Sequence, residues 1–330
     1  MKRMTFLVLF AFAVGMTMAQ SMYVHKTGGN VYEFKLSDVD SINFVASATD
    51  RYLYTITYMP NGGEGEVVVD TVFYGESYTI VAFIQQEGYY IGSWNTDPDG
   101  HGVAFKSGIV INSVSRNITL YAQWRAYDGI ENGYYYVDLG LPSGLKWAAC
   151  NVGATKPEEY GNYYAWGETE PKTTYDWSTY KWCNGSSSTL TKYNTSSSYG
   201  TVDNKTVLEL EDDAASANWG GAWRMPTDAE WTELRTNCTW TWTTLNGVNG
   251  YEVEGTNGNS IFLPAAGYRV DVDWYDAGRY GRGYCWSSSL DTDYPNYAWD
   301  VCFGSGRVDR NGNYRFCGQS VRPVLSPPAP

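Results

Sequence analysis

The stretch WRMPTDAEW, residues 223–231, contains the clearest helix start in the sequence. Thr227 stands three residues before Glu230, the spacing at which a threonine hydroxyl and a glutamate carboxylate each accept a hydrogen bond from the other residue's backbone N–H group. Trp231 then begins an apolar face. The stretch therefore predicts a short capped helix from Asp228 to about Arg235.

Around this helix the chain has short alternating segments separated by Gly and Asn, from about residue 134 to residue 325. Such a pattern is typical of an irregular, loop-rich α+β domain. Twelve of the fourteen tryptophans lie in this part of the chain. Because a loop-rich domain needs large side chains to bury enough apolar area, we expect some of them in its core. A Ser-, Thr-, Asn- and Gly-rich stretch over 183–201 predicts a long surface loop.

The region before this domain has strand patterns of its own. YTITY (54–58) alternates with period two, and further strands are predicted at 67–72, 78–83 and 118–124. Nearer the N-terminus, residues 22–44 alternate around Gly28-Gly29 as a β-hairpin does. The sequence thus predicts a β appendage followed by a small β-rich domain.

The N-terminus has the three parts of a secretory signal peptide. Lys2 and Arg3 precede an apolar run over 6–14, and small residues follow up to Ala19. The run is too short to span a bilayer, and no later segment reaches the roughly 18 apolar residues of a transmembrane helix. We therefore expect an exported chain, located at the cell surface or outside the cell, with the periplasm as an alternative.

Three motifs of the small β domain carry a family resemblance: TYMPNGGEG (57–65), GYYIGSWNTDPDGHG (88–102) and NITLYAQW (117–124). They resemble the Listeria-Bacteroides repeat of bacterial surface proteins, in a single copy of about seventy residues. The resemblance implies a β-grasp-like module that serves as a spacer or adhesion element, with no ligand of its own.

The C-terminal domain carries a second resemblance, to the Fibrobacter succinogenes major paralogous domain. Its motifs, in chain order, are VDLGLPSGLKWAACNVGA (137–154), YYAWGET (163–169), WGGAWRMPTDAEW (219–231), GNSIFLPAAGYR (258–269), YCWSSS (284–289) and GQSVRPV (318–324). WRMPTDAEW and SVRPV also look like the core of formylglycine-generating-enzyme-like domains. The resemblance implies a C-type-lectin-like fold.

The expected organisation has six parts, and the fold class is α+β. They are a signal peptide (1–19), a hairpin segment and linker (20–50), the Listeria-Bacteroides-type repeat (51–126), a linker (127–137), the lectin-like domain (138–325) and a proline-rich tail (326–330).

Charge and residue usage exclude several functions. The chain has 36 acidic and 23 basic residues, which argues against nucleic acid as a partner. Its two histidines, His25 and His101, lie outside the C-terminal domain, so Ser-His-Asp and Cys-His catalysis have no imidazole there. Glycoside hydrolysis needs two carboxylates that face each other across a sugar, and acidic pairs such as Glu168 with Glu170 offer the residue type. Acidic residues that are solvated or cap helices are far commoner than such catalytic pairs. We expect a protein that is not an enzyme.

The six cysteines all lie in the C-terminal half: Cys150, Cys183, Cys238, Cys285, Cys302 and Cys317. In an exported protein they allow disulfides with 15 connectivities, and the sequence does not choose among them. None of them lies in a motif that matches the reactive pair of the formylglycine-generating enzymes, which leaves an oxidase as a minor alternative. A zinc site would have to be built from thiolates alone.

No cofactor is expected. The acidic run Glu209, Glu211, Asp212 and Asp213 offers oxygen ligands, so bound calcium is an alternative. The run lacks the regular alternation of a dedicated calcium loop. No metal-binding residue is therefore assigned.

Residues 271–317 have an unusual composition. They contain no Lys, Glu, Gln or Met in 47 residues, whereas residues 138–270 contain 17 of these in 133. Some lectin-like domains are targets of diversity-generating retroelements, which randomise adenines in AAC-type codons, and codons ending in C cannot encode the missing types. The abundant Tyr, Ser, Asn, Gly and Arg are also the residues that a paratope favours.

These observations predict a ligand-binding surface for an extracellular protein or a glycan. Its candidate residues are Asp271, Asp273, Tyr275, Asp276, Arg279, Arg282, Tyr294, Asn296, Tyr297, Asp300, Arg307, Asp309, Asn313 and Tyr314. Two alternatives stay open. One is a structural or adhesive surface component in which this region is an ordinary divergent loop, and the other is the oxidase. Cys285, Cys302 and Cys317 are either disulfide partners or incidental products of randomised codons.

Overall fold

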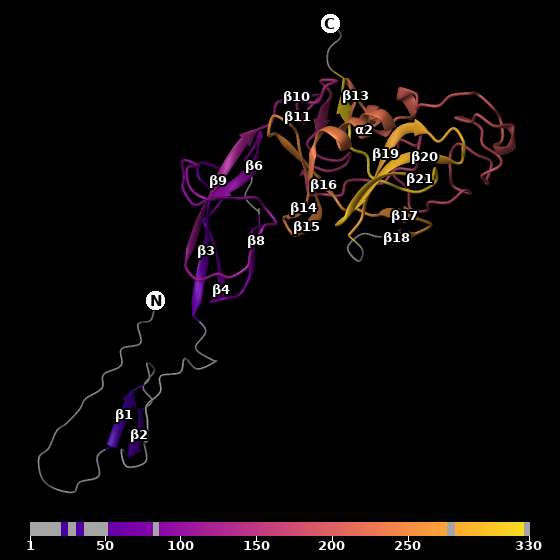
Figure 1. Ribbon diagram of the computed structural model, residues 1–330. Helices are drawn as coiled ribbons and strands as arrows, with labels where there is room; N and C mark the ends of the chain where they lie inside the picture. The colour runs from indigo at the N-terminus through magenta and orange to yellow at the C-terminus, as the bar shows by residue number, and fades with distance from the viewer. Residues whose placement is uncertain (1–20, 26–30, 36–51, 82–85, 276–280, 327–330) are drawn as a thin grey trace, which may run out of the picture. The chain divides into compact units, whose positions relative to one another are not determined.

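The computed structural model describes residues 21–25, 31–35, 52–81, 86–275 and 281–326 (Figure 1). The chain forms two compact units, residues 1–52 and 53–330. In the first unit, β1 (Ser21–His25) pairs antiparallel with β2 (Val31–Lys35), as two strands of the predicted hairpin would. Gly28-Gly29 and residues 36–44 lie outside the described residues. The proposed signal peptide lies outside the described residues.

The second unit begins with the small β domain. Its five-stranded sheet has the order β4 (Val68–Phe73), β3 (Leu53–Met59), β9 (Ile118–Ala126), β6 (Tyr89–Asn95) and β7 (Ala104–Phe105). β3 and β9 run parallel, and β5 (Tyr78–Thr79) pairs separately with β8 (Val110–Ile111). Alternate residues of β3, Ile56 and Tyr58, are buried beside Trp94, as the period-two pattern predicts.

The C-terminal domain begins earlier than expected. Residues 127–137, expected as a linker, instead contain β10 (Gly129–Glu131) and most of β11 (Tyr134–Asp138). They belong to a five-stranded sheet of order β10, β11, β12 (Lys146–Ala148), β22 (Val324–Leu325) and β13 (Trp223–Arg224). The sheet joins the first and last strands of the domain, and a linker prediction based on local composition misses such long-range pairing.

Three further antiparallel sheets complete the domain. One contains β14 (Thr239–Leu245), β15 (Val248–Glu254) and β16 (Ser260–Pro264), and a two-stranded one contains β17 (Tyr268–Val270) and β18 (Asp273–Tyr275). The third contains β19 (Gly283–Leu290), β20 (Tyr297–Gly304) and β21 (Arg307–Tyr314), drawn in yellow in Figure 1.

Helices are few in the part of the chain that the structure describes. α1 (Ala214–Trp219) and α2 (Asp228–Asn237) are the α-helices, and η2 (Ser197–Tyr199) and η3 (Leu210–Asp212) are single 3₁₀ turns. The capping box predicted for α2 is present, with Thr227 and Glu230 in both roles. The fold is therefore mostly β, with less helix than the α+β expectation suggested.

Between β12 and β13 the chain runs through a long stretch without regular strands, and it is nonetheless well packed. Leu190 and Tyr193 are fully buried, so the stretch 183–201 is more than the surface loop that its polar composition indicated. Trp147, Trp166, Trp223 and Trp286 are fully buried as well, which confirms that tryptophans form part of the core.

Two buried arginines tie this irregular chain together. Arg322 of the SVRPV motif donates to the Asn151 side chain and to the carbonyls of Ala148, Ala149 and Phe262, at 2.8–3.0 Å. Arg315 donates in the same way to the Tyr180 hydroxyl and to the carbonyls of Lys192, Tyr193 and Pro295. Each guanidinium thus satisfies three backbone carbonyls at once from within the domain.

Candidate ligand-binding surface

Three of the tyrosines that were predicted to bind a ligand lie together at one end of the β19–β20–β21 sheet. Tyr297 is the first residue of β20 and pairs directly with Tyr314, the last residue of β21, with ring centroids 4.4 Å apart. Tyr294 lies in the preceding turn, 6.4 Å from Tyr297. Tyr294 and Tyr314 are 58% and 39% exposed. Cross-strand pairing therefore presents these rings as one partly exposed group.

Two residues that the sequence did not single out extend this group. Trp177 lies 5.9 Å from Tyr314 and 5.0 Å from Phe316, and Phe316 stacks on Tyr314 at 5.5 Å. We call Trp177, Tyr294, Tyr297, Tyr314 and Phe316 the aromatic cluster. Phe316 falls inside the compositionally unusual window and was recoverable from it. Trp177 lies far upstream, and no local signal connects it to β21.

The β17–β18 hairpin forms a neighbouring part of the surface. Asp271, with φ of 52°, begins its two-residue turn, and its backbone exchanges two hydrogen bonds with Tyr175 at 2.8 Å. Trp274 is 54% exposed, and one edge of its ring packs on Tyr163. The segment from Tyr175 to Trp177 thus connects the hairpin with the aromatic cluster.

The remaining candidates fall into four groups. Asp271, Asp273, Tyr275 and Arg307 are exposed. Arg282, Asp309 and Asn313 are half-buried, and Arg307 pairs with Asp309 at 3.3 Å. Asn296 and Asp300 are buried. Asp276 and Arg279 lie outside the described residues.

Asp300 and Asn296 are the candidates that the structure removes from the exposed surface. The side chain of Asp300 points into the domain, where its Oδ2 accepts hydrogen bonds from Asn313 Nδ2 at 2.7 Å and Gln319 Nε2 at 2.6 Å. Burial raises the pKa of Asp300 to about 6, against the lowering effect of these amides. Asp300 therefore supports the sheet from within, because its position in β20 directs it to the covered face.

The six cysteines are unpaired in this structure. All six carry free thiols, so none of the 15 disulfide connectivities is present. Burial raises the pKa of Cys150 and Cys238 to about 11 and that of Cys285 and Cys317 to about 12. A thiol with such a pKa contributes little nucleophilic thiolate at neutral pH.

The acidic run that offers calcium ligands forms ion pairs with lysines. Carboxylate oxygens of Glu209, Glu211 and Asp212 lie within 4.8 Å of one another. Lys192 lies 2.6 Å from Asp212 and 2.6 Å from Glu209. Hydrogen bonds to these two acids help to hold the pKa of Lys192 above its ordinary value, against the effect of burial. Lys192 thus neutralises part of the negative charge of these carboxylates.

Comparison with known proteins finds a family match for the small β domain. Residues 54–123 match the model of the Listeria-Bacteroides repeat domain. The repeat thus covers the small β domain and ends before β10, and the match does not extend to the C-terminal domain. No curated protein and no solved structure matches the chain. Within the described residues, no helix has the length and apolar character needed to cross a membrane.

Proposed function

We propose that this chain is an exported binding protein, without enzymatic activity, whose C-terminal domain recognises an extracellular protein or a glycan. The observation that carries the proposal is the aromatic cluster, which gathers Trp177, two strand ends and a turn into one partly exposed group. Exposed aromatic rings gathered in one place are typical of recognition surfaces, because they offer rigid contact area at low entropic cost.

The finer fold and the origin of this surface belong to the same proposal. The resemblance to the Fibrobacter succinogenes major paralogous domain implies a C-type-lectin-like fold, in which the repeat domain would act as a spacer from the cell surface. The missing Lys, Glu, Gln and Met support retroelement diversification of residues 271–317. A near-copy of these codons in the adjacent DNA, with mismatches on adenines, would identify the varied positions.

Binding of the full mature chain to a defined glycan array and a panel of purified extracellular domains tests the proposal. We expect saturable binding to some members, and its loss when Tyr294, Tyr297 and Tyr314 are replaced together by Ala. Tyr74, which is exposed on the repeat domain, provides the control when replaced by Ala. Binding that persists in a calcium chelator is expected of a paratope-like surface.

Two outcomes would contradict the proposal. If the triple variant binds the same members as the parent chain, the aromatic cluster is not the binding surface. If the parent chain shows no saturable binding at all, the structural alternative is favoured.

A further inference from the structure

A second feature, separate from the aromatic cluster, is a cavity of about 420 Å³ in the unit formed by residues 53–330. The repeat domain contributes one part of its lining and the C-terminal domain the other. Only two residues separate β9 from β10, and the Tyr127 backbone N–H donates to the Gly88 carbonyl at 3.0 Å. The volume lies within the range of roughly 300 to 1,000 Å³ that small-molecule pockets have.

One side of the cavity is aromatic. Tyr127 stacks on Tyr135 with centroids 4.9 Å apart, and Tyr90 lies 5.3 Å from Tyr127 on its other side. Hydrogen bonds hold the outer rings in place: Ser260 N donates to the Tyr90 hydroxyl at 3.3 Å, and the Tyr135 hydroxyl donates to Glu87. The three rings therefore form a preformed stack rather than freely rotating side chains.

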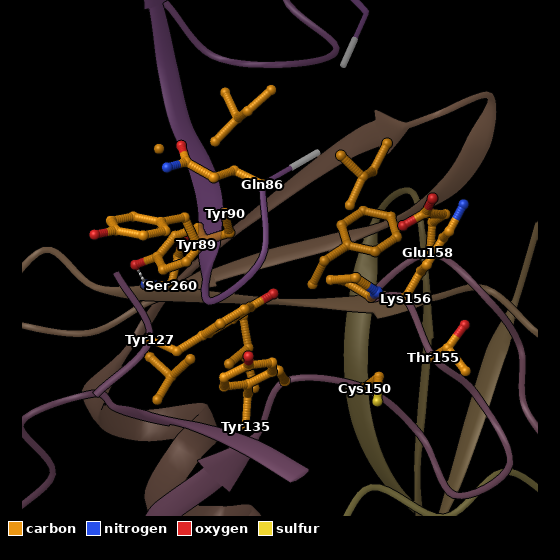
Figure 2. Close-up of a pocket in the computed structure, with 18 of the residues that line it drawn as sticks. Gln86, Tyr89, Tyr90, Tyr127, Tyr135, Cys150, Thr155, Lys156, Glu158 and Ser260 are labelled. Atoms are coloured by element: carbon orange, nitrogen blue, oxygen red, sulfur yellow. Dashed lines mark hydrogen bonds between the residues drawn. The ribbon is translucent and has the colours of Figure 1, made fainter. Parts of the chain in front are cut away.

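The other side is polar. Figure 2 shows Thr155, Lys156 and Glu158 across the cavity from Tyr127 and Tyr135. Asn246 donates to the Glu158 carboxylate at 2.6 Å and orients it. The loop thus presents a cationic donor, a carboxylate acceptor and a hydroxyl within four residues of one another.

These two sides together select a class of ligand. A pyranose has an apolar C–H face that stacks on aromatic rings and a rim of hydroxyls that both donate and accept hydrogen bonds. A purely aromatic ligand would fit the tyrosines but would give the Lys156 ammonium no new partner as water is displaced, at a cost in free energy. We propose that this cavity binds a neutral sugar, with one pyranose ring on Tyr127 and Tyr135 and its hydroxyls on Lys156 and Glu158.

The test uses the full mature chain and a panel of neutral sugars: glucose, galactose, mannose, N-acetylglucosamine and their β1,4-linked disaccharides, with phenylalanine and indole as aromatic comparisons. Saturation-transfer NMR and calorimetry report binding. We expect at least one sugar to bind with a dissociation constant in the millimolar range or below. Lys156→Ala and Glu158→Gln should each weaken it about tenfold, the effect of losing one charge-assisted hydrogen bond.

Control variants separate this site from the aromatic cluster and from general loss of structure. Arg116→Ala and Glu170→Gln change exposed charges and should leave sugar binding unaltered. The Tyr294, Tyr297 and Tyr314 triple variant should also bind sugar normally, since those residues do not line the cavity. The proposal is overturned if no sugar of the panel binds at millimolar concentration, if indole or phenylalanine binds instead, or if the Lys156 and Glu158 variants bind as the parent does.

Discussion

The repeat domain and the C-terminal domain differ in how they supply hydrogen-bond partners to their buried backbone groups. In the repeat domain, alternating strands satisfy the backbone, and the core is made of apolar and aromatic residues such as Ile56, Trp94 and Leu120. In the C-terminal domain, two buried arginines also satisfy backbone carbonyls: Arg315 those of irregular segments, and Arg322 those at β12 and β16. The difference teaches that a loop-rich domain adds a few buried polar side chains to the hydrogen-bonded ladders of its sheets.

Replacing Arg322 by Ala tests this dependence most severely. Three carbonyls and the Asn151 side chain lose their donor, and each unsatisfied buried group costs about 1 to 3 kcal/mol, so we expect a loss of about 5 kcal/mol in the free energy of unfolding. Urea denaturation followed by near-UV circular dichroism provides the measurement. The exposed Arg116→Ala is the control, and equal stability of the two variants would break the comparison.

Trp94→Ala is the corresponding change in the repeat domain. Trp94 is fully buried and packs edge-on against Tyr58 at 4.8 Å. Removing such a side chain costs about 3 to 5 kcal/mol, because it leaves a cavity in a packed core. We expect hydrogen exchange to accelerate in β3, β6 and β9 and much less in β19 to β21. Equal acceleration in both domains would show that they unfold as one unit.

Asp300→Asn sharpens the comparison through pH. The folded-state pKa of Asp300, about 6, lies above the unfolded value near 3.8, so the folded chain binds more protons between these values. The stabilisation that protonated Asp300 gives the folded chain is fully present below about pH 3.8. It is lost as pH rises through 6, which lowers the free energy of unfolding of the parent by about 3 kcal/mol. The stability difference between Asp300→Asn and the parent should therefore grow from pH 4 to pH 7. Asp309→Asn, at a side chain that is 48% exposed, is the matched control variant.

Part of this structure was predictable because the responsible interactions are local. The hairpin of β1 and β2, the alternation in β3 and the capping box of α2 all follow from residues within a few positions of one another. The three tyrosines were predicted to bind a ligand from composition alone, and the structure shows that their rings lie close together. Asp300 was wrongly expected at the surface, since composition does not tell which face of a strand is covered.

The sequence by itself determined the repeat domain, the start of α2 and the absence of an imidazole from the C-terminal domain. Only the tertiary structure decided that Trp177 lies against Tyr314, that Arg322 is buried among carbonyls, and that Tyr127 faces Lys156 across a cavity. The physical reason is the separation along the chain of the residues that interact. Strand periodicity and helix caps act over a few residues, whereas these contacts join segments that only the folded chain brings together.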